Sequence, residues 1–146
     1  MADAVTSQII HNGPRNFVAR FTNISDGTGE SAVTKINAAS ANGVVIAGNT
    51  IYPGTNFKIT AVKFAVTGMQ VELLWVATSN QQFMVLSGAD HWYFKDQGGI
   101  TVPSGLSGAT GSVAFTTIAY PAASPANLKN ATYDITIYAT KGIPQS

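Results

Sequence analysis

The sequence contains no cysteine and few charged residues, and both shortages restrict what the protein can be. Without Cys there is no disulfide framework, zinc–thiolate site, iron–sulfur cluster or thiol nucleophile, and the redox compartment stays open. Charged residues make up 10% of the 146 residues, against about 25% in an average globular domain, while hydrophobic residues make up 45%. Self-repulsion therefore cannot keep the chain unfolded, and we expect a single domain spanning residues 1–146.

The net charge is also low, and we expect neither a leader segment nor a membrane-spanning apolar run. Eight Lys and Arg against seven Asp and Glu leave a formal net charge of +1, too little for counterion release, so we expect no nucleic-acid partner. The start, MADAVTSQIIHNG, has an acid at Asp3 and no basic segment, so no signal peptide is predicted. The longest uncharged apolar stretch, near residues 44–47, is far shorter than the roughly 20 residues that cross a bilayer, so we expect no membrane partner.

What the sequence does contain is a period of two, the pattern of strands with one face in a core. In residues 131–140 the odd-numbered positions are apolar and the even-numbered ones are more polar. In residues 57–67 both faces of the strand are apolar, which predicts a central strand. Val, Ile, Thr, Phe and Tyr dominate these segments and long helix formers are scarce, so we expect almost no helix. The predicted strands lie at 5–10, 15–25, 32–37, 44–47, 57–67, 70–78, 83–86, 91–94, 111–119 and 131–140.

Turn residues such as Asn12-Gly13-Pro14, Asn42-Gly43 and Pro53-Gly54 separate these segments. Many short strands with frequent turns and no βαβ alternation predict an all-β fold: an antiparallel β-sandwich, jelly-roll-like, with about eight to ten short strands. The pattern leaves the strand order open. It also leaves open whether residues 1–8 form a strand of the same sheet or an extended N-terminal arm that reaches a neighbouring subunit.

Three short motifs suggest chemistry but lack its structural context. Residues 27–32 match the dinucleotide turn G-x-G-x-x-A, yet strand-forming residues follow where a helix N-terminus would have to hold the phosphate. Residues 105–109 begin like a nucleophile elbow, with the second glycine one place early. The oxygens of Asp26, Thr28 and Glu30 suit calcium, but the EF-hand spacing is missing and a solvated acidic turn is the simpler interpretation. We therefore expect no catalytic residues, no cofactor and no metal.

The densest aromatic run, His91-Trp92-Tyr93-Phe94, is the candidate interface. Alternation places Trp92 and Phe94 on one face of a strand and His91 and Tyr93 on the other, so one pair can pack in the core and the other can meet a partner. Asp90 precedes His91, but strand neighbours point to opposite faces, so the two do not form an acid–base pair.

Four segments taken together resemble a family of small structural proteins of tailed phages, of the type that decorates or cements a capsid. They are residues 6–37 (TSQIIHNGPRNFVARFTNISDGTGESAVTKIN), 68–88 (GMQVELLWVATSNQQFMVLSG), 94–117 (FKDQGGITVPSGLSGATGSVAFTT) and 130–142 (NATYDITIYATKG). The stretch PAASPANLKN looks longer than that family's usual loop. The resemblance carries over no functional residue.

The resemblance implies a non-enzymatic virion protein that binds the assembled capsid shell and stabilises it. Its partners would be the major capsid protein and further copies of itself, arranged as a homotrimer. It would lie on the capsid surface, after assembly in the host cytoplasm. Two alternatives stay open: a component of the phage tail, neck or a fibre, and a carbohydrate-binding β-sandwich that uses the aromatics of residues 91–94.

Overall fold

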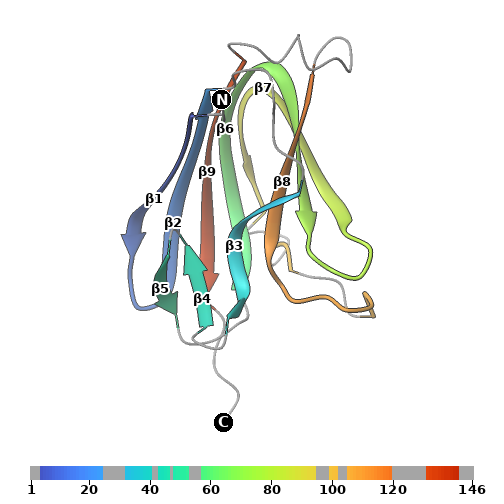
Figure 1. Cartoon of the computed structure of the whole chain (residues 1–146). Coiled ribbons are helices and arrows are strands. Elements are labelled where there is room, and N and C mark those ends of the chain that lie inside the picture. The colour runs from blue at the N-terminus through green and yellow to red at the C-terminus, as the bar shows by residue number, and fades with distance from the viewer. Residues whose placement is uncertain are drawn as a thin grey trace.

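The computed structural model shows an all-β protein in which one antiparallel sheet folds back on itself (Figure 1). The structure describes residues 4–24, 32–40, 43–46, 48–52, 57–94, 99–101, 105–119 and 131–141. Within these ranges there are nine strands and no helix, which confirms the predicted all-β antiparallel fold, and hence no helix there that could cross a membrane. The strands are β1 (Ala4–Asn12), β2 (Asn16–Ile24), β3 (Val33–Ser40), β4 (Gly43–Ile46), β5 (Asn49–Tyr52), β6 (Phe57–Trp75), β7 (Gln81–Tyr93), β8 (Val113–Ala119) and β9 (Thr132–Lys141).

The strands follow the order β1-β2-β9-β6-β8-β3-β4-β5, and β7 pairs with β6. Figure 1 shows β3, β4 and β5 in front of the layer that contains β1, β2 and β9. Strand β8 pairs with β3 and so belongs to the same layer as β3. Side chains from both layers meet between them: the ring centroids of Phe21 on β2 and Phe115 on β8 are 5.4 Å apart, edge to face. Tyr133 on β9 contacts Phe115 in the same way at 5.8 Å. Such pairs add roughly 0.5–1.5 kcal/mol each beyond the burial of their area, so this ring cluster joins the two layers.

Strand β6 organises the sheet because it is 19 residues long and pairs with three strands. Residues 57–67 pair with β9 and residues 69–75 with β8, while β7 pairs with both halves of β6. Gly68, with φ of +78°, lies where the pairing changes from β9 to β8. Glycine adopts this left-handed conformation without steric cost, so the strand changes direction here without ending. The two separate strands predicted at 57–67 and 70–78 are therefore one bent strand.

The same correction applies to the segments predicted at 83–86 and 91–94, because residues 83–86 and 91–93 are parts of one strand, β7, which ends at Tyr93. Strand β5 was not predicted. By contrast, β9 follows the predicted alternation closely, since its odd-numbered residues from 133 to 139 are buried and its even-numbered residues are partly exposed. The sequence left open whether residues 1–8 are an arm or a strand. Residues 4–8 belong to β1 and pair with β2 from Ala4 opposite Ile24 to Gln8 opposite Arg20, while residues 1–3 lie outside the described residues.

Candidate functional site

The outward-pointing side chains of β1, β2, β9, β6 and β7 share one side of the sheet, which we call the outer face. The strand registers place Arg20 opposite Thr136, Thr136 opposite Lys63, and Lys63 opposite His91. These four residues thus form a row across β2, β9, β6 and β7. Their sequence neighbours on β2, β9 and β6, such as Phe21, are buried in the core, because side chains on a strand alternate between its faces.

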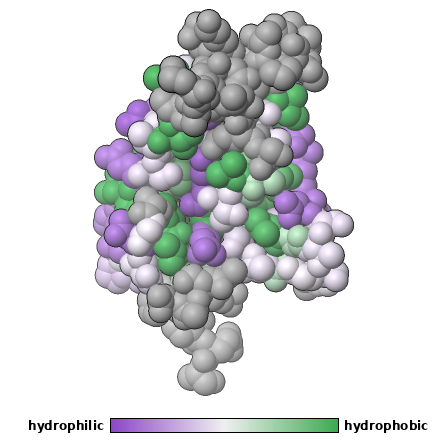
Figure 2. Space-filling model, viewed as in Figure 1, coloured by the Kyte–Doolittle hydropathy of each residue, from purple (hydrophilic) through white to green (hydrophobic). Residues whose placement is uncertain are grey.

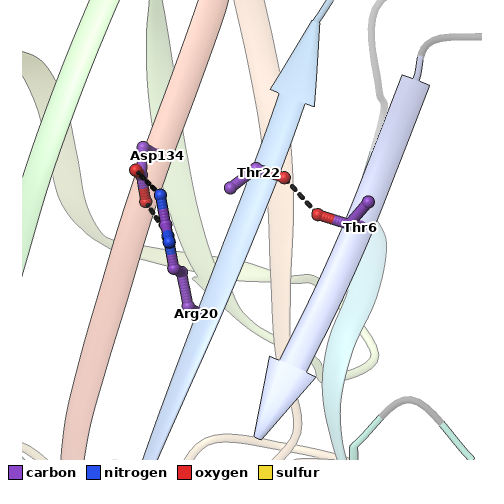
Figure 3. A network of polar contacts seen from close by, with 4 residues as sticks. All are labelled: Thr6, Arg20, Thr22 and Asp134. Atoms are coloured by element: carbon purple, nitrogen blue, oxygen red, sulfur yellow. Dashed lines mark hydrogen bonds and ion pairs between the residues drawn. The ribbon is translucent and has the colours of Figure 1, made fainter. Parts of the chain in front are cut away.

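A bidentate ion pair lies beside this row (Figure 3). Arg20 Nε donates to Asp134 Oδ1 at 2.9 Å, and Arg20 Nη2 donates to Asp134 Oδ2 at 2.5 Å. The hydrogen bonds that Arg20 donates to Asp134, together with the negative charge of that carboxylate, raise the pKa of Arg20, so the guanidinium stays protonated. On the neighbouring strands the hydroxyls of Thr6 and Thr22 hydrogen-bond to each other. Polar side chains on this part of the outer face are therefore held in fixed positions.

The outer face is hollowed on both sides of Tyr138. One hollow, of about 340 Å³, is lined by the ion pair together with Lys63, Thr136 and Tyr138, among others. The other, of about 290 Å³, is bordered by Tyr138 with His11 and residues of β2, β6 and β9. Both lie near the lower end of the size range of small-molecule sites, which runs from roughly 300 to 1,000 Å³. The phenol ring of Tyr138 therefore stands where a ligand or partner in either hollow would touch it.

The predicted aromatic run divides between the two faces of β7, as its alternation indicated. Trp92 packs against Phe64 with ring centroids 4.9 Å apart and an interplanar angle of 77°, and Phe94 also packs against the core. The indole Nε1 of Trp92 donates to Asp90 Oδ2 at 3.1 Å. Asp90 Oδ1 accepts from the backbone N–H of His91, and no described contact links the carboxylate to the imidazole. Trp92 and Phe94 thus support the fold from the inner side.

His91 and Tyr93 lie on the outer face, where they form an aromatic cluster with Tyr138. The His91 ring lies 4.2 Å from the Tyr93 ring and 5.7 Å from the Tyr138 ring, tilted by 33° and 25°. Tyr93 is 68% exposed, and its hydroxyl lies 3.0 Å from His91 Nδ1. The Nε2 atom of His91 is buried and has no hydrogen-bond partner among the described residues. Stacking, more than hydrogen bonding, therefore holds this imidazole in place.

The outer face consequently offers three kinds of contact within one row and its neighbours. It has the exposed phenol ring of Tyr93 beside the partly exposed ring of Tyr138, the guanidinium–carboxylate pair and the ammonium of Lys63. The Lys63 side chain has no ion-pair or hydrogen-bond partner in the described part of the chain. Tyrosine and arginine are enriched at protein interfaces, and phenol rings also stack on sugars. This combination is suited to binding.

The other motifs considered in the sequence do not add to this site. In residues 105–109 the backbone carbonyl of Ser107 accepts from Thr78 N–H at 3.1 Å, and Gly108 has φ of +72°, so the segment forms a turn against the β6–β7 connection. The acidic group Asp26, Thr28 and Glu30, and most of the glycine motif at 27–32, lie outside the described residues. Within the described ranges no three His, Asp or Glu side chains come close enough to hold a metal ion.

Comparison with known proteins finds no matching family model, no matching curated protein and no matching solved structure. The site therefore has to be interpreted from its own residues. Sequence reasoning named His91 and Tyr93 but missed Arg20, Lys63 and Tyr138. Tyr138 had one available signal, since it is the only aromatic residue among the wetter positions of residues 131–140. The other two residues join the site only through the strand order.

Proposed function

We propose that this chain is a non-enzymatic structural protein of a tailed phage that binds the assembled capsid shell and stabilises it. The proposal rests on the resemblance of four segments to that family. The observation that supports it best is the outer face, where Tyr93, Tyr138 and Arg20 are held on five paired strands. Residues of these types carry much of the binding energy at protein interfaces, and a paired sheet presents them with little loss of entropy on binding.

Co-sedimentation with matching empty capsids tests this function directly. We expect the wild-type chain to pellet with expanded shells, and the double variant Tyr93→Ala/Tyr138→Ala to stay in the supernatant. Val85→Ala is the matched control, because Val85 is an exposed apolar residue on the same strand as Tyr93 but outside the aromatic cluster. Wild-type protein that fails to bind expanded shells would show that the proposal is wrong.

A carbohydrate-binding function is the second candidate, favoured by the hollow beside Tyr138. There a phenol ring borders a space that also contains a carboxylate, a guanidinium and the hydroxyl of Thr136, which are groups that stack on and hydrogen-bond to a sugar. Titration with host surface polysaccharide distinguishes the two functions. A glycan-binding protein would lose its signal in Tyr138→Ala, while a capsid protein would show no glycan binding in either form.

A location in the tail, neck or a fibre is a third alternative, since proteins of those parts also bind other phage proteins without catalysis. An electron-microscopy map of the intact particle decides between them. We expect density for this fold on the capsid shell, with its outer face toward the major capsid protein. Density confined to the neck or tail would contradict the capsid assignment while leaving a structural role in place.

A further inference from the structure

Strand β1 ends the sheet, and no described residue pairs with its second edge. An edge strand presents a row of backbone N–H and C=O groups to which another strand can add. Natural proteins protect such edges with charged side chains, proline, short length or bulges. Among its nine residues, AVTSQIIHN, β1 has neither a charged residue nor a proline. Its register is regular from residue 4 to residue 9 and shifts only between Ile9 and His11.

The other two strands with a free edge in the described part of the chain are better protected. Strand β5, at the opposite end of the strand order, is only four residues long. Strand β7 carries a charge at Asp90 and a glycine with φ of +74° at Gly88, where its pairing with β6 is also interrupted. Strand β1 is therefore the described edge that most readily accepts another strand.

Apolar side chains on the inner side of β1 are incompletely covered. Val5 lies opposite Asn23, whose side chain points inward and is 1% exposed, so Val5 also points toward the inner side, yet it is 38% exposed. Ile9 shares that side and is partly buried against the core. In Figure 1, β1 lies at the left margin, where Figure 2 shows hydrophobic and hydrophilic residues next to each other. A strand added at this edge would cover both side chains.

We propose that β1 pairs antiparallel with β1 of a second copy of this chain, around a twofold axis perpendicular to the sheet. Such an axis keeps the inner faces of both copies on the same side, so only residues of equal parity can lie opposite each other. A register centred on Ser7 places Val5 opposite Ile9 of the second copy, twice, and Thr6 opposite Gln8. Registers displaced by one step place Val5 or Ile9 opposite Ser7 instead.

The sequence of residues 5–9 selects the centred register because its polarity is the same in both directions. Val-Thr-Ser-Gln-Ile runs apolar, polar, small, polar, apolar, which makes the strand complementary to itself. Apolar residues directly opposite each other on one face of an antiparallel pair cover each other from water and stabilise the pairing. This self-complementarity is the reason to name a second copy as the occupant, in preference to an unrelated protein.

This pairing joins the sheets of two copies and brings their outer faces into one continuous surface. It predicts an even number of copies, whereas the family resemblance implies three. It does not depend on capsid binding, because the edge and its exposed side chains belong to the isolated chain.

Crosslinking tests the register, and the lack of native cysteine makes it simple. Opposite residues in an antiparallel pair have Cα atoms roughly 4.5–5.5 Å apart, within the range that a disulfide spans. We expect Ser7→Cys to form a covalent dimer on mild oxidation. Ser87→Cys, an exposed serine on the β7 edge, is the matched control and should remain monomeric on a non-reducing gel.

The mass of the protein in solution tests whether the β1 edges of two copies pair. We expect the full-length chain to have the mass of two copies at tens of micromolar, and Val5→Lys to have the mass of one. Val85→Lys is the control, because Val85 is exposed to almost the same extent, 37% against 38%, on a different strand. It should leave the mass unchanged.

Several outcomes would overturn the twofold pairing. They are a wild-type mass of one copy, a mass of three copies without Ser7 crosslinking, equal crosslinking by Ser87→Cys, and a dimer that survives Val5→Lys. Should Val5→Lys fail to fold, the conservative Ser7→Cys variant still decides. A wild-type chain that is a monomer and still binds capsids would reject this inference alone, and a wild-type dimer that does not bind capsids would reject only the proposed function.

Discussion

Arg20 of β2 and Asp134 of β9 are 114 residues apart in the sequence and meet through two parallel hydrogen bonds on the outer face. The contact is diagonal, because the register places Arg20 opposite Thr136 and Asp134 opposite Thr22. Both side chains remain 40% exposed or more. Exposed ion pairs contribute little to stability, typically about 0–1 kcal/mol, so the main effect of this pair is to fix the shape and charge of the surface.

Removing the ion pair should therefore change the fold's stability only slightly. In a double-mutant cycle with Arg20→Gln and Asp134→Asn, we expect a small coupling free energy that decreases further at high salt, because both side chains are exposed to solvent. Urea unfolding at low and at molar sodium chloride measures both. A coupling of several kcal/mol that is insensitive to salt would show that the pair holds the two strands together.

The bend of β6 makes a stronger prediction. Gly68 has φ of +78°, and a Cβ added there would lie 3.2 Å from the Cβ of Ala131, while Gly88 has φ of +74° and nothing within 4 Å. Both alanine substitutions meet the left-handed backbone penalty of about 1–2 kcal/mol. We expect Gly68→Ala to lower the free energy of unfolding by a further ~1 kcal/mol, since its methyl group also crowds Ala131.

Thermal or urea unfolding of the two variants side by side measures that difference, and Gly88→Ala serves as the control for backbone strain alone. Equal losses would mean that the close approach of Ala131 to the bend has no energetic consequence.

The contrast between β9 and β6 shows what the sequence can predict. The alternation in residues 131–140 identifies the faces of β9, because burial of one face is a local pattern with a period of two. The continuity of β6 through Gly68 is invisible to that pattern, since a glycine between two alternating segments also occurs at turns. The cluster of His91 with Tyr138 depends on β9 and β7 flanking β6, which is a long-range pairing that periodicity does not contain.

Lys141, the last residue of β9, donates hydrogen bonds to the turn between β1 and β2. Lys141 Nζ donates to Asn12 Oδ1 at 2.5 Å and to the Gly13 carbonyl at 2.7 Å, and its backbone N–H donates to the Arg15 carbonyl at 2.6 Å. We expect Lys141→Met to lower the free energy of unfolding by about 1–3 kcal/mol, because hydrogen bonds to a charged group contribute more than neutral ones.

Lys58→Met is the matched control for this effect. Lys58 is an exposed lysine on β6 whose side chain has no hydrogen-bond or ion-pair partner among the described residues, and changes at such positions usually stay within about 0.5 kcal/mol. Urea unfolding of both variants makes the comparison. If the two lose the same amount, the loss reflects charge alone and the turn does not need its ammonium.

The stacked imidazole of His91 gives the prediction that links stability to binding. Because His91 Nε2 is buried with no described partner, His91→Phe removes an unsatisfied polar atom and keeps a ring between Tyr93 and Tyr138. The substitution also loses the contact between His91 Nδ1 and the Tyr93 hydroxyl. An unsatisfied buried group costs about 1–3 kcal/mol and an exposed hydrogen bond contributes about 1 kcal/mol, so we expect the free energy of unfolding to stay equal or rise. His91→Ala should lower it, because both tyrosine rings lose their stacking partner.

Capsid co-sedimentation tests whether binding depends on the aromatic ring at position 91 or on its nitrogen atoms. We expect His91→Phe, which keeps a ring, to bind like wild type, and His91→Ala to bind more weakly. Equally weakened binding by His91→Phe and His91→Ala would show that the imidazole itself meets the partner.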